Sequence, residues 1–406
     1  MMEFDYHPIR FLRIHSSKYD PKADIKTEVW HAEFEPDPMK AHQNTNIVAT
    51  CGGNSVCFID VDSGKVKQKY ISNNSQEVFY CCTWLRIPVG SSLSIIALVA
   101  GSSHGKLHII CPSSCVTILE ISVVESKKKK NTQSTMVNCF SVYKDSTNNE
   151  ALLCGIGDGT ILAIDLKCKT TKEEFTCECK TIGKFSLDDQ LFQIAFCPVT
   201  LTILAACDQG LVGIHVPSHD ALKNNNYTVT KYQLTKKYRK EENLADSVQI
   251  LGNGLVSVKY ALHGKIYIFD LKHAHETSKS DKPSTTIEFT PKYLLEWSDT
   301  DNYFMNIGAS KTANLLACGD DKGMIWLYNI ESLKSGASTT PKILAPTKKI
   351  EWPPVEDIHS DKKQRLKLSD IDDIVLDKVA IHSSGNYIVA VTNNNIVCLW
   401  KKSGIS

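Results

Sequence analysis

One pattern recurs along the chain and limits its fold more than any other feature of the sequence. Each copy has an apolar strand that ends in small residues with Ala or Cys and Gly, then a polar turn, then a β-rich strand that ends near Asp or Trp. The seven copies are IVATCGGNSVCFIDVDSG, IIALVAGSSHGKLHIICPSS, ALLCGIGDGTILAIDLKC, ILAACDQGLVGIHVPS, GLVSVKYALHGKIYIFDLK, LLACGDDKGMIWLYNIES and YIVAVTNNNIVCLWKK. Their closing strands fall near residues 59, 110, 164, 215, 269, 328 and 400, a spacing of roughly 50 residues that is typical of propeller blades with insertions.

These copies predict an all-β chain: a seven-bladed WD-repeat β-propeller that occupies residues 1–406 as a single domain, with its blades in residues 28–402. A four-stranded blade cannot bury its faces alone, and radial stacking hides both of them. We expect the leading segment Ile9–Ser17 to supply the outer strand of the last blade, which closes the ring without an exposed edge. Of the WD-repeat signature, only the pair Leu399-Trp400 and the endings in Asp remain.

Four polar, mostly Lys-rich segments separate the copies, and we expect them to be exposed loops. They are residues 123–136, 232–246, 272–286 and 353–372. Within them, the clustered charges of Lys127–Lys130 and Lys236–Lys240 suit the phosphates of nucleosomal DNA or a nuclear-import signal. The alternative for both clusters is a solvated loop.

Composition and cysteine usage narrow the class of protein. The net charge of +1 argues against a strongly electrostatic nucleic-acid binder. No run of 18 apolar residues is present, and the first residues lack a secretory signal, so we expect no membrane segment. The 15 cysteines lie mostly in apolar runs, where a reduced thiol behaves as a small hydrophobe, and this favours an intracellular protein. Cys177 and Cys179 lack a second pair at zinc spacing, so we predict no metal site.

Motifs for catalysis are missing from the sequence. There is no nucleophile elbow, no HExxH, no phosphate-binding Gly-Lys loop and no pair of carboxylates at a useful spacing. His104, His215 and His263 fall in different copies, and we interpret them as structural. The chain is therefore predicted to be a non-enzyme with no cofactor and no small-molecule substrate.

Aromatic residues recur in register at the start of the innermost strands. We align the copies on Phe34, Trp84, Phe140, Phe196 and Ile307. Four residues earlier stand Trp30, Tyr80, Met136, Phe192 and Tyr303. In a propeller this position enters the innermost strand beside the central channel, so equivalent residues converge at one mouth.

Rings that meet at this mouth would make a box for a methylated ammonium ion. Trimethyl-lysine has no N–H to donate, and ring faces attract its charge at roughly 0.5–2 kcal/mol per contact. The box would hold Trp30, Tyr80, Tyr303 and its neighbour Phe304, with Asp377 as a carboxylate at the equivalent place in the last copy. Adjacent side chains of a strand point to opposite faces, so both Tyr303 and Phe304 face one cation only if the chain bends before the strand begins. The alternative is that these rings only pack the end of the channel.

Several segments resemble a known family. EVWHAEFEP, EVFYCCTW, NLLACGDDKGMIWLYNIESL, APTKKIEWP and NNNIVCLW are similar to the WD-repeat domain of the leucine-rich repeat and WD-repeat-containing proteins associated with the origin recognition complex (ORCA). EVFYCCTW, LVAGSSHGKLHII and DTDNYFMNI also resemble, more distantly, the embryonic ectoderm development (EED) propellers of Polycomb complexes. The ORCA family carries leucine-rich repeats before its propeller, and we expect none in this chain.

The resemblance implies a function that the motifs alone do not give. The EED family holds trimethyl-lysine of histone H3 in an aromatic cage, and its cage positions fall on Trp30, Tyr80, Tyr303 and Phe304. The ORCA family implies a nuclear scaffold that reads repressive trimethyl-lysine marks and stabilises the origin recognition complex on heterochromatin. Two alternatives remain open: an EED-like Polycomb subunit that reads the same mark, and a propeller adaptor without methyl-lysine binding.

Overall fold

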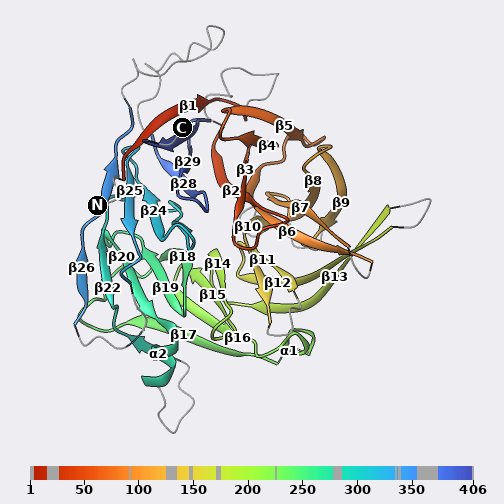
Figure 1. Cartoon of the computed structure of the whole chain (residues 1–406). Coiled ribbons are helices and arrows are strands. Elements are labelled where there is room, and N and C mark those ends of the chain that lie inside the picture. The colour runs from red at the N-terminus through yellow and green to blue at the C-terminus, as the bar shows by residue number, and fades with distance from the viewer. Residues whose placement is uncertain are drawn as a thin grey trace.

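Antiparallel β-sheets arranged around a common centre make up the chain (Figure 1). The structure is a computed structural model that describes residues 4–15, 27–90, 93–124, 135–145, 150–170, 175–224, 226–277, 286–333, 336, 340–353 and 374–404. The prediction of an all-β propeller is confirmed. Among the described residues, no helix is long and apolar enough to cross a membrane.

Most described strands form antiparallel meanders of four, which run from an inner strand to an outer one. In pairing order they are β2 (Val29–Pro36), β3 (Asn44–Gly52), β4 (Ser55–Asp60) and β5 (Lys65–Ile71); β6 (Phe79–Val89), β7 (Leu93–Ser102), β8 (Lys106–Cys111) and β9 (Val116–Ser122); β10 (Val137–Lys144), β11 (Glu150–Ile156), β12 (Thr160–Thr170) and β13 (Phe175–Ser186); β14 (Leu191–Cys197), β15 (Thr202–Cys207), β16 (Gly210–His215) and β17 (Thr228–Leu234). They continue as β18 (Ala245–Gly252), β19 (Leu255–Tyr260), β20 (Lys265–Asp270) and β22 (Tyr293–Glu296); β23 (Gly308–Ser310), β24 (Leu315–Gly319), β25 (Ile325–Asn329) and β27 (Lys348–Ile350); β28 (Leu376–Ile381), β29 (Tyr387–Thr392), β30 (Val397–Lys402) and β1 (Tyr6–Leu12).

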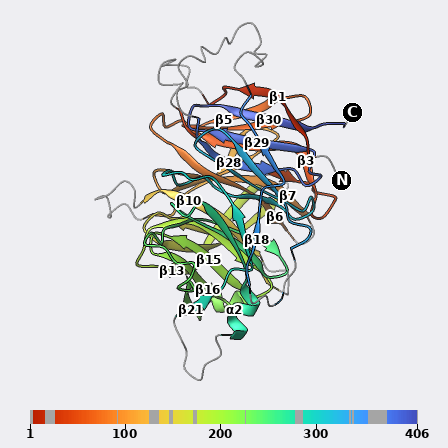
Figure 2. The ribbon, with the colours of Figure 1, turned by 90° about the vertical axis from the view of Figure 1, so that its left-hand side faces the viewer.

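Short elements complete the outer edge. The strands β21 (Thr286–Phe289) and β26 (Lys342–Leu344) pair in parallel with β17 and β22. The helices α1 (His219–Lys223) and α2 (Leu271–Thr277) follow β16 and β20. In the side view β21 and α2 lie next to each other at the lower end of the molecule (Figure 2).

The repeat seen in the sequence corresponds to one part of each meander. The predicted closing strands near residues 59, 110, 164, 215, 269, 328 and 400 fall in β4, β8, β12, β16, β20, β25 and β30. Each of these is the third strand of its meander, and a fourth strand lies outside it. The repeat is therefore the hairpin of the second and third strands, which are the most apolar.

The first strand packs beside the last one, although its bounds differ from the predicted segment 9–17. β1 pairs antiparallel with β30, with Tyr6 opposite Lys402 and Leu12 opposite Val397. It ends at Leu12, opposite the first residue of β30, and His15 beyond it is buried. The His15 ring shares hydrogen bonds with the Oγ1 of Thr50 at 2.9 Å and with the Oγ of Ser55 at 3.0 Å. The ring of sheets is thus tied together by segments from both ends of the chain (Figure 1).

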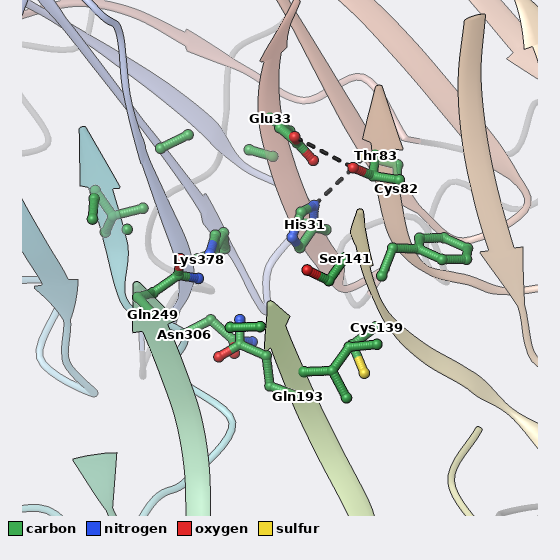
Figure 3. A pocket seen from close by; sticks show the side chains of 18 of the residues that line it. His31, Glu33, Cys82, Thr83, Cys139, Ser141, Gln193, Gln249, Asn306 and Lys378 are labelled. Carbon is green, nitrogen blue, oxygen red and sulfur yellow. Dashed lines mark hydrogen bonds between the residues drawn. The ribbon is translucent and has the colours of Figure 1, made fainter. Parts of the chain in front are cut away.

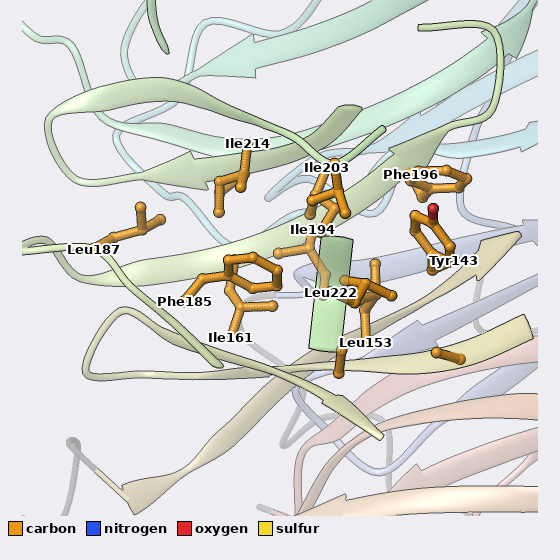
Figure 4. Packing of buried hydrophobic residues seen from close by; sticks show 14 of the residues in the cluster. Tyr143, Leu153, Ile161, Phe185, Leu187, Ile194, Phe196, Ile203, Ile214 and Leu222 are labelled. Atoms are coloured by element: carbon orange, nitrogen blue, oxygen red, sulfur yellow. The ribbon is translucent and has the colours of Figure 1, made fainter. Parts of the chain in front are cut away.

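Apolar side chains fill the space between neighbouring meanders. One such cluster joins β10–β13 to β14–β17, and there the rings of Tyr143 and Phe196 lie 4.7 Å apart (Figure 4). Leu222 of α1 is fully buried in the same cluster, so this short helix seals its outer side.

Two of the segments predicted as exposed loops contain buried structure, so that prediction is wrong for them. Tyr232 and Leu234 lie in β17, and their alternation with exposed residues turns both toward the core. In residues 272–286, Ala274 of α2 is buried; it lies three residues after Leu271, which precedes the segment and is also buried. Few apolar residues mark these elements in the sequence, which is why the polar composition concealed them. Residues 125–134, 278–285 and 354–373, with the predicted cluster Lys127–Lys130, lie outside the described residues.

Candidate functional site

A β-bulge near the start of the inner strands places equivalent residues at one end of the channel. The pairing register shifts across one residue in β2, β6, β10, β14, β18 and β28. A bulged residue has no partner on the neighbouring strand, and bulges commonly re-aim a side chain beside a functional site. The bulged residues, which we call the bulge ring, are Trp30, Tyr80, Asn138, Phe192, Asp246 and Asp377.

At one position the bulge ring differs from the aromatic register predicted from the sequence. In the third meander the bulged residue is Asn138, two residues after the predicted Met136, which precedes β10. The Asn138 amide donates to the backbone oxygen of Leu191 at 2.7 Å, so this member braces the next inner strand.

The first two predicted cage residues are in contact. The rings of Trp30 and Tyr80 have centroids 5.2 Å apart and planes inclined by 54°. Both side chains are partly buried, and each is the second residue of its strand. Their contact follows from the packing of β2 against β6 with the bulge at the same height in both strands.

Tyr303 and Phe304 form the second group of rings because the chain bends at Phe304. This residue has a φ of 70°, in the left-handed region that a bulky side chain rarely adopts. The two rings therefore lie on one side, 4.9 Å apart and inclined by 32°. Phe192, which the cage prediction omitted, packs edge-on against Phe304 at 5.0 Å. Its place in the aromatic register was the available sequence signal.

The segment around Tyr303 is not the innermost strand that the sequence predicted. β23 covers only Gly308–Ser310, and Asn306 makes an isolated bridge to Lys378. Side-chain acceptors replace the missing ladder: the backbone N–H of Phe304 donates to Asp246 Oδ2 at 2.9 Å, and that of Ile307 to Ser247 Oγ at 3.0 Å.

Tyr80 of the first ring group lines a cavity together with Phe192, which packs against the second group. Trp30, Tyr303 and Phe304 are not among the described residues that line it, and no ring contact joins the two groups among the described residues. The cavity has a volume of about 420 Å³, and both Tyr80 and Phe192 line it. Its other end reaches Phe34 and Asn44, so it follows the inner strands along their length. Tyr303 lies beside it and is 46% exposed, which leaves that ring accessible from outside.

Below the rings the cavity wall is polar (Figure 3). The Lys378 ammonium donates to the backbone oxygen of Ile307 at 2.8 Å, and burial lowers its pKa to about 8. Burial raises the pKa of the Glu33 carboxyl to about 7, and Thr83 donates to that carboxyl at 3.4 Å. Burial and the Lys378 charge lower the pKa of His31 to about 3, so this ring is neutral. Such a lining accepts water and polar groups and is a poor seat for an apolar ligand.

The two carboxylates of the bulge ring have different surroundings. Asp246 is fully buried, forms an ion pair with Lys259 and holds the backbone of Phe304. Asp377 is 3% exposed, and its Oδ2 is buried without a hydrogen-bond partner. Burial raises the pKa of the Asp377 carboxyl well above its usual range, and Glu28 adds to the rise.

The remaining predicted residues have local partners. His215 bonds to the Thr200 backbone oxygen at 2.9 Å, and His263 shares a hydrogen bond with the Tyr267 hydroxyl at 2.8 Å. His104 shares one with its neighbour Ser103 at 3.1 Å. Cys177 and Cys179 lie on β13, with Cys177 opposite Cys168 of β12. No group of three or more His, Cys, Asp or Glu suited to a metal ion occurs within the described ranges.

Comparison with known proteins places the chain in a family. A sequence model of the family described as Leucine-rich repeat and WD repeat-containing protein 1, WD domain, matches residues 2–403. The chain belongs to this family. The family consists of scaffold-type WD-repeat proteins and is not known as a family of enzymes.

Three relatives named Leucine-rich repeat and WD repeat-containing protein 1 illustrate the match. The Xenopus tropicalis protein is 26% identical over 405 residues, which cover 97% of this chain and 55% of the relative. The Danio rerio protein is 26% identical over 413 residues, or 97% of this chain and 50% of the relative. The Homo sapiens protein is 25% identical over 403 residues, or 97% of this chain and 57% of the relative. The chain spans about half the length of the curated relatives that it matches.

Proposed function

We propose that this chain is a nuclear, chromatin-associated WD-repeat scaffold that binds histone tails carrying repressive trimethyl-lysine marks. Trp30, Tyr80, Tyr303 and Phe304 hold the methylated ammonium, and Phe192 backs the second pair of rings. The observation that carries this proposal is that two groups of packed rings each reach one cavity, the first through Tyr80 and the second through Phe192. A trimethylammonium ion offers charge and apolar surface but no N–H, which is the chemistry that ring faces recognise.

The structure around Phe304 supports a preformed site. The left-handed backbone at Phe304 is held by the buried Asp246, so the bend exists before any ligand arrives. Such a strained conformation in a bulky residue costs free energy and is commonly retained where it serves a function. Preorganised rings lose little side-chain entropy when a cation binds.

Binding of methylated histone H3 peptides tests this proposal. Calorimetric titration of the wild type should give tighter binding of a trimethyl-lysine peptide than of the unmodified peptide. Tyr303→Ala should weaken the binding of the methylated peptide by about 2- to 30-fold, which corresponds to the loss of one cation–π contact. Ile343→Ala, which removes a 60% exposed side chain from an outer strand, is the matched control and should change nothing. Equal binding of both peptides by all three proteins would mean that the rings only pack the channel.

We further propose that this scaffold recruits or stabilises the origin recognition complex, which the resemblance to the ORCA family supports. In the predicted cluster Lys236–Lys240, the residues that would contact nucleosomal DNA are Lys236 and Lys237, which are exposed. The other two basic residues already have partners: Arg239 pairs with Glu288 at 2.9 Å, and Lys240 donates to two backbone oxygens. Co-purification from nuclear extract tests the proposal. Origin recognition subunits are expected, whereas a histone methyltransferase in their place would favour the EED-like alternative.

A further inference from the structure

Asp377, the second carboxylate of the bulge ring, has no structural role that its contacts explain. Each carboxylate has one buried oxygen that no described residue binds, but Asp246 has Lys259 as its cation, whereas Asp377, at the equivalent position of β28, has no ion pair with a described residue. An unpaired carboxyl in such a place is costly unless a partner binds it. At the bulge position it also shares the end of the channel with Trp30 and Tyr80.

Asp377 lies between the two ring groups. Its backbone oxygen accepts from the N–H of Asn306 at 2.7 Å, and the Asn306 amide donates to the backbone oxygen of Phe304 at 3.2 Å. On the other side, Glu28 lies near enough to raise the pKa of both Asp377 and the Tyr80 hydroxyl. The strands agree with these contacts, because β28 packs against both β23 and β2.

We infer that Asp377, assisted by Glu28, is a hydrogen-bond acceptor of the cage, so that the site binds dimethyl-lysine at least as tightly as trimethyl-lysine. This inference rests on the proposed methyl-lysine function and specifies the ligand of the same site.

The chemistry follows from what each ligand can donate. A dimethylammonium ion keeps one N–H, which a carboxylate accepts in a charge-assisted hydrogen bond, whereas a trimethylammonium ion has none to offer. Burial raises the pKa of Glu28 to about 7 and that of Asp377 well above its usual range. A cation that enters between the rings favours the ionised form of both carboxyls and is itself compensated by their charge.

The experiment compares four ligands on matched proteins. Histone H3 peptides with the same lysine unmodified, monomethylated, dimethylated or trimethylated are titrated at pH 7.5 into wild type, Asp377→Asn and Glu28→Gln. Asp301→Asn is the control, because it removes an exposed carboxylate near Tyr303. Asp377→Asn preserves the shape of a buried side chain and removes its charge, so it should fold with an unchanged or higher melting temperature.

In the wild type, dimethyl-lysine should bind as tightly as trimethyl-lysine or more tightly. Asp377→Asn should shift the ratio of the two dissociation constants by about tenfold toward trimethyl-lysine, or about 1.4 kcal/mol, and Glu28→Gln by less. The control should leave the ratio unchanged. A wild type that strongly prefers trimethyl-lysine, with the same ratio in Asp377→Asn, overturns this inference and leaves the cage intact. If no methylated peptide binds more tightly than the unmodified one, the proposed function fails and this inference with it.

Discussion

The ion pair of Asp246 and Lys259 permits a test that separates stability from the geometry of the site. Both side chains are fully buried, and the Lys259 ammonium also lies 4.7 Å from the centre of the Trp297 ring. Replacing Asp246 with Leu leaves that ammonium buried without its carboxylate. We expect the free energy of unfolding to fall by about 3–5 kcal/mol, the cost of leaving one partner of a buried pair alone.

Removing both charges should restore stability but not the site. In Asp246→Leu/Lys259→Met neither charge of this pair remains, and such apolar replacements are commonly neutral or stabilising. The N–H of Phe304 still loses its acceptor, which lies at 2.9 Å in the wild type, and with it the support for a φ of 70°. The double variant should therefore unfold like the wild type and bind the methylated peptide weakly.

Urea unfolding followed by tryptophan fluorescence measures the first effect, and peptide titration measures the second. Two results would refute the reasoning. One is a single variant that loses less than about 1 kcal/mol, since the Lys259 charge would then not be buried in an uncompensated form. The other is a double variant that binds the peptide as the wild type does, because Phe304 would then keep its conformation without Asp246.

Two further predictions concern stability alone. Gly308→Ala should destabilise the fold by about 1–3 kcal/mol, because an added Cβ would lie 1.9 Å from the backbone oxygen of Val379. An unchanged melting temperature would show that β23 and β28 can move apart without loss of stability. Burial lowers the pKa of His15 and His31 from 6.5 to about 3. Since the unfolded chain takes up these protons first, stability should fall as the pH drops below 6.5, by about 2 kcal/mol per histidine at pH 5. In urea titrations at pH 7 and pH 5, His15→Gln should lose less stability between the two pH values than the wild type; an equal loss would contradict the assignment.

The fold was predictable because its signal is local. A hairpin of two apolar strands joined by a short turn is recognisable within about 20 residues, and the chain repeats it. The outer strands are harder to find, since β5 is mostly exposed, β17 has one face in water, and both resemble polar segments in the sequence. The helix α2 was missed for the same reason, as only Leu271 and Ala274 mark its buried side.

The candidate site was predictable only as far as the aromatic register reaches. Trp30, Tyr80 and Tyr303 follow from their distance to the next large apolar residue of the inner strand. Asn138 escaped because that spacing fails in β10, where only strand pairing reveals the bulge. The role of Asp246 lies in a contact with a backbone N–H 58 residues away, and no local pattern records such a contact.

The bulge ring explains how a symmetric fold carries an asymmetric site. The inner strands follow one another around the channel as β2, β6, β10, β14, β18, β23 and β28, and β28 returns to β2. Each bulge turns its residue toward the same end of the channel. The chemical character of that part of the channel therefore depends on which side chain the bulged residue carries. Aromatic rings stand on β2, β6 and β14 and before β23, and the unpaired carboxylate stands on β28, between the rings of β2 and those before β23. In the proposed function, a cation held by both ring groups on this side lies next to the strand that carries Asp377, and its methylation state, and not only its charge, should therefore govern binding.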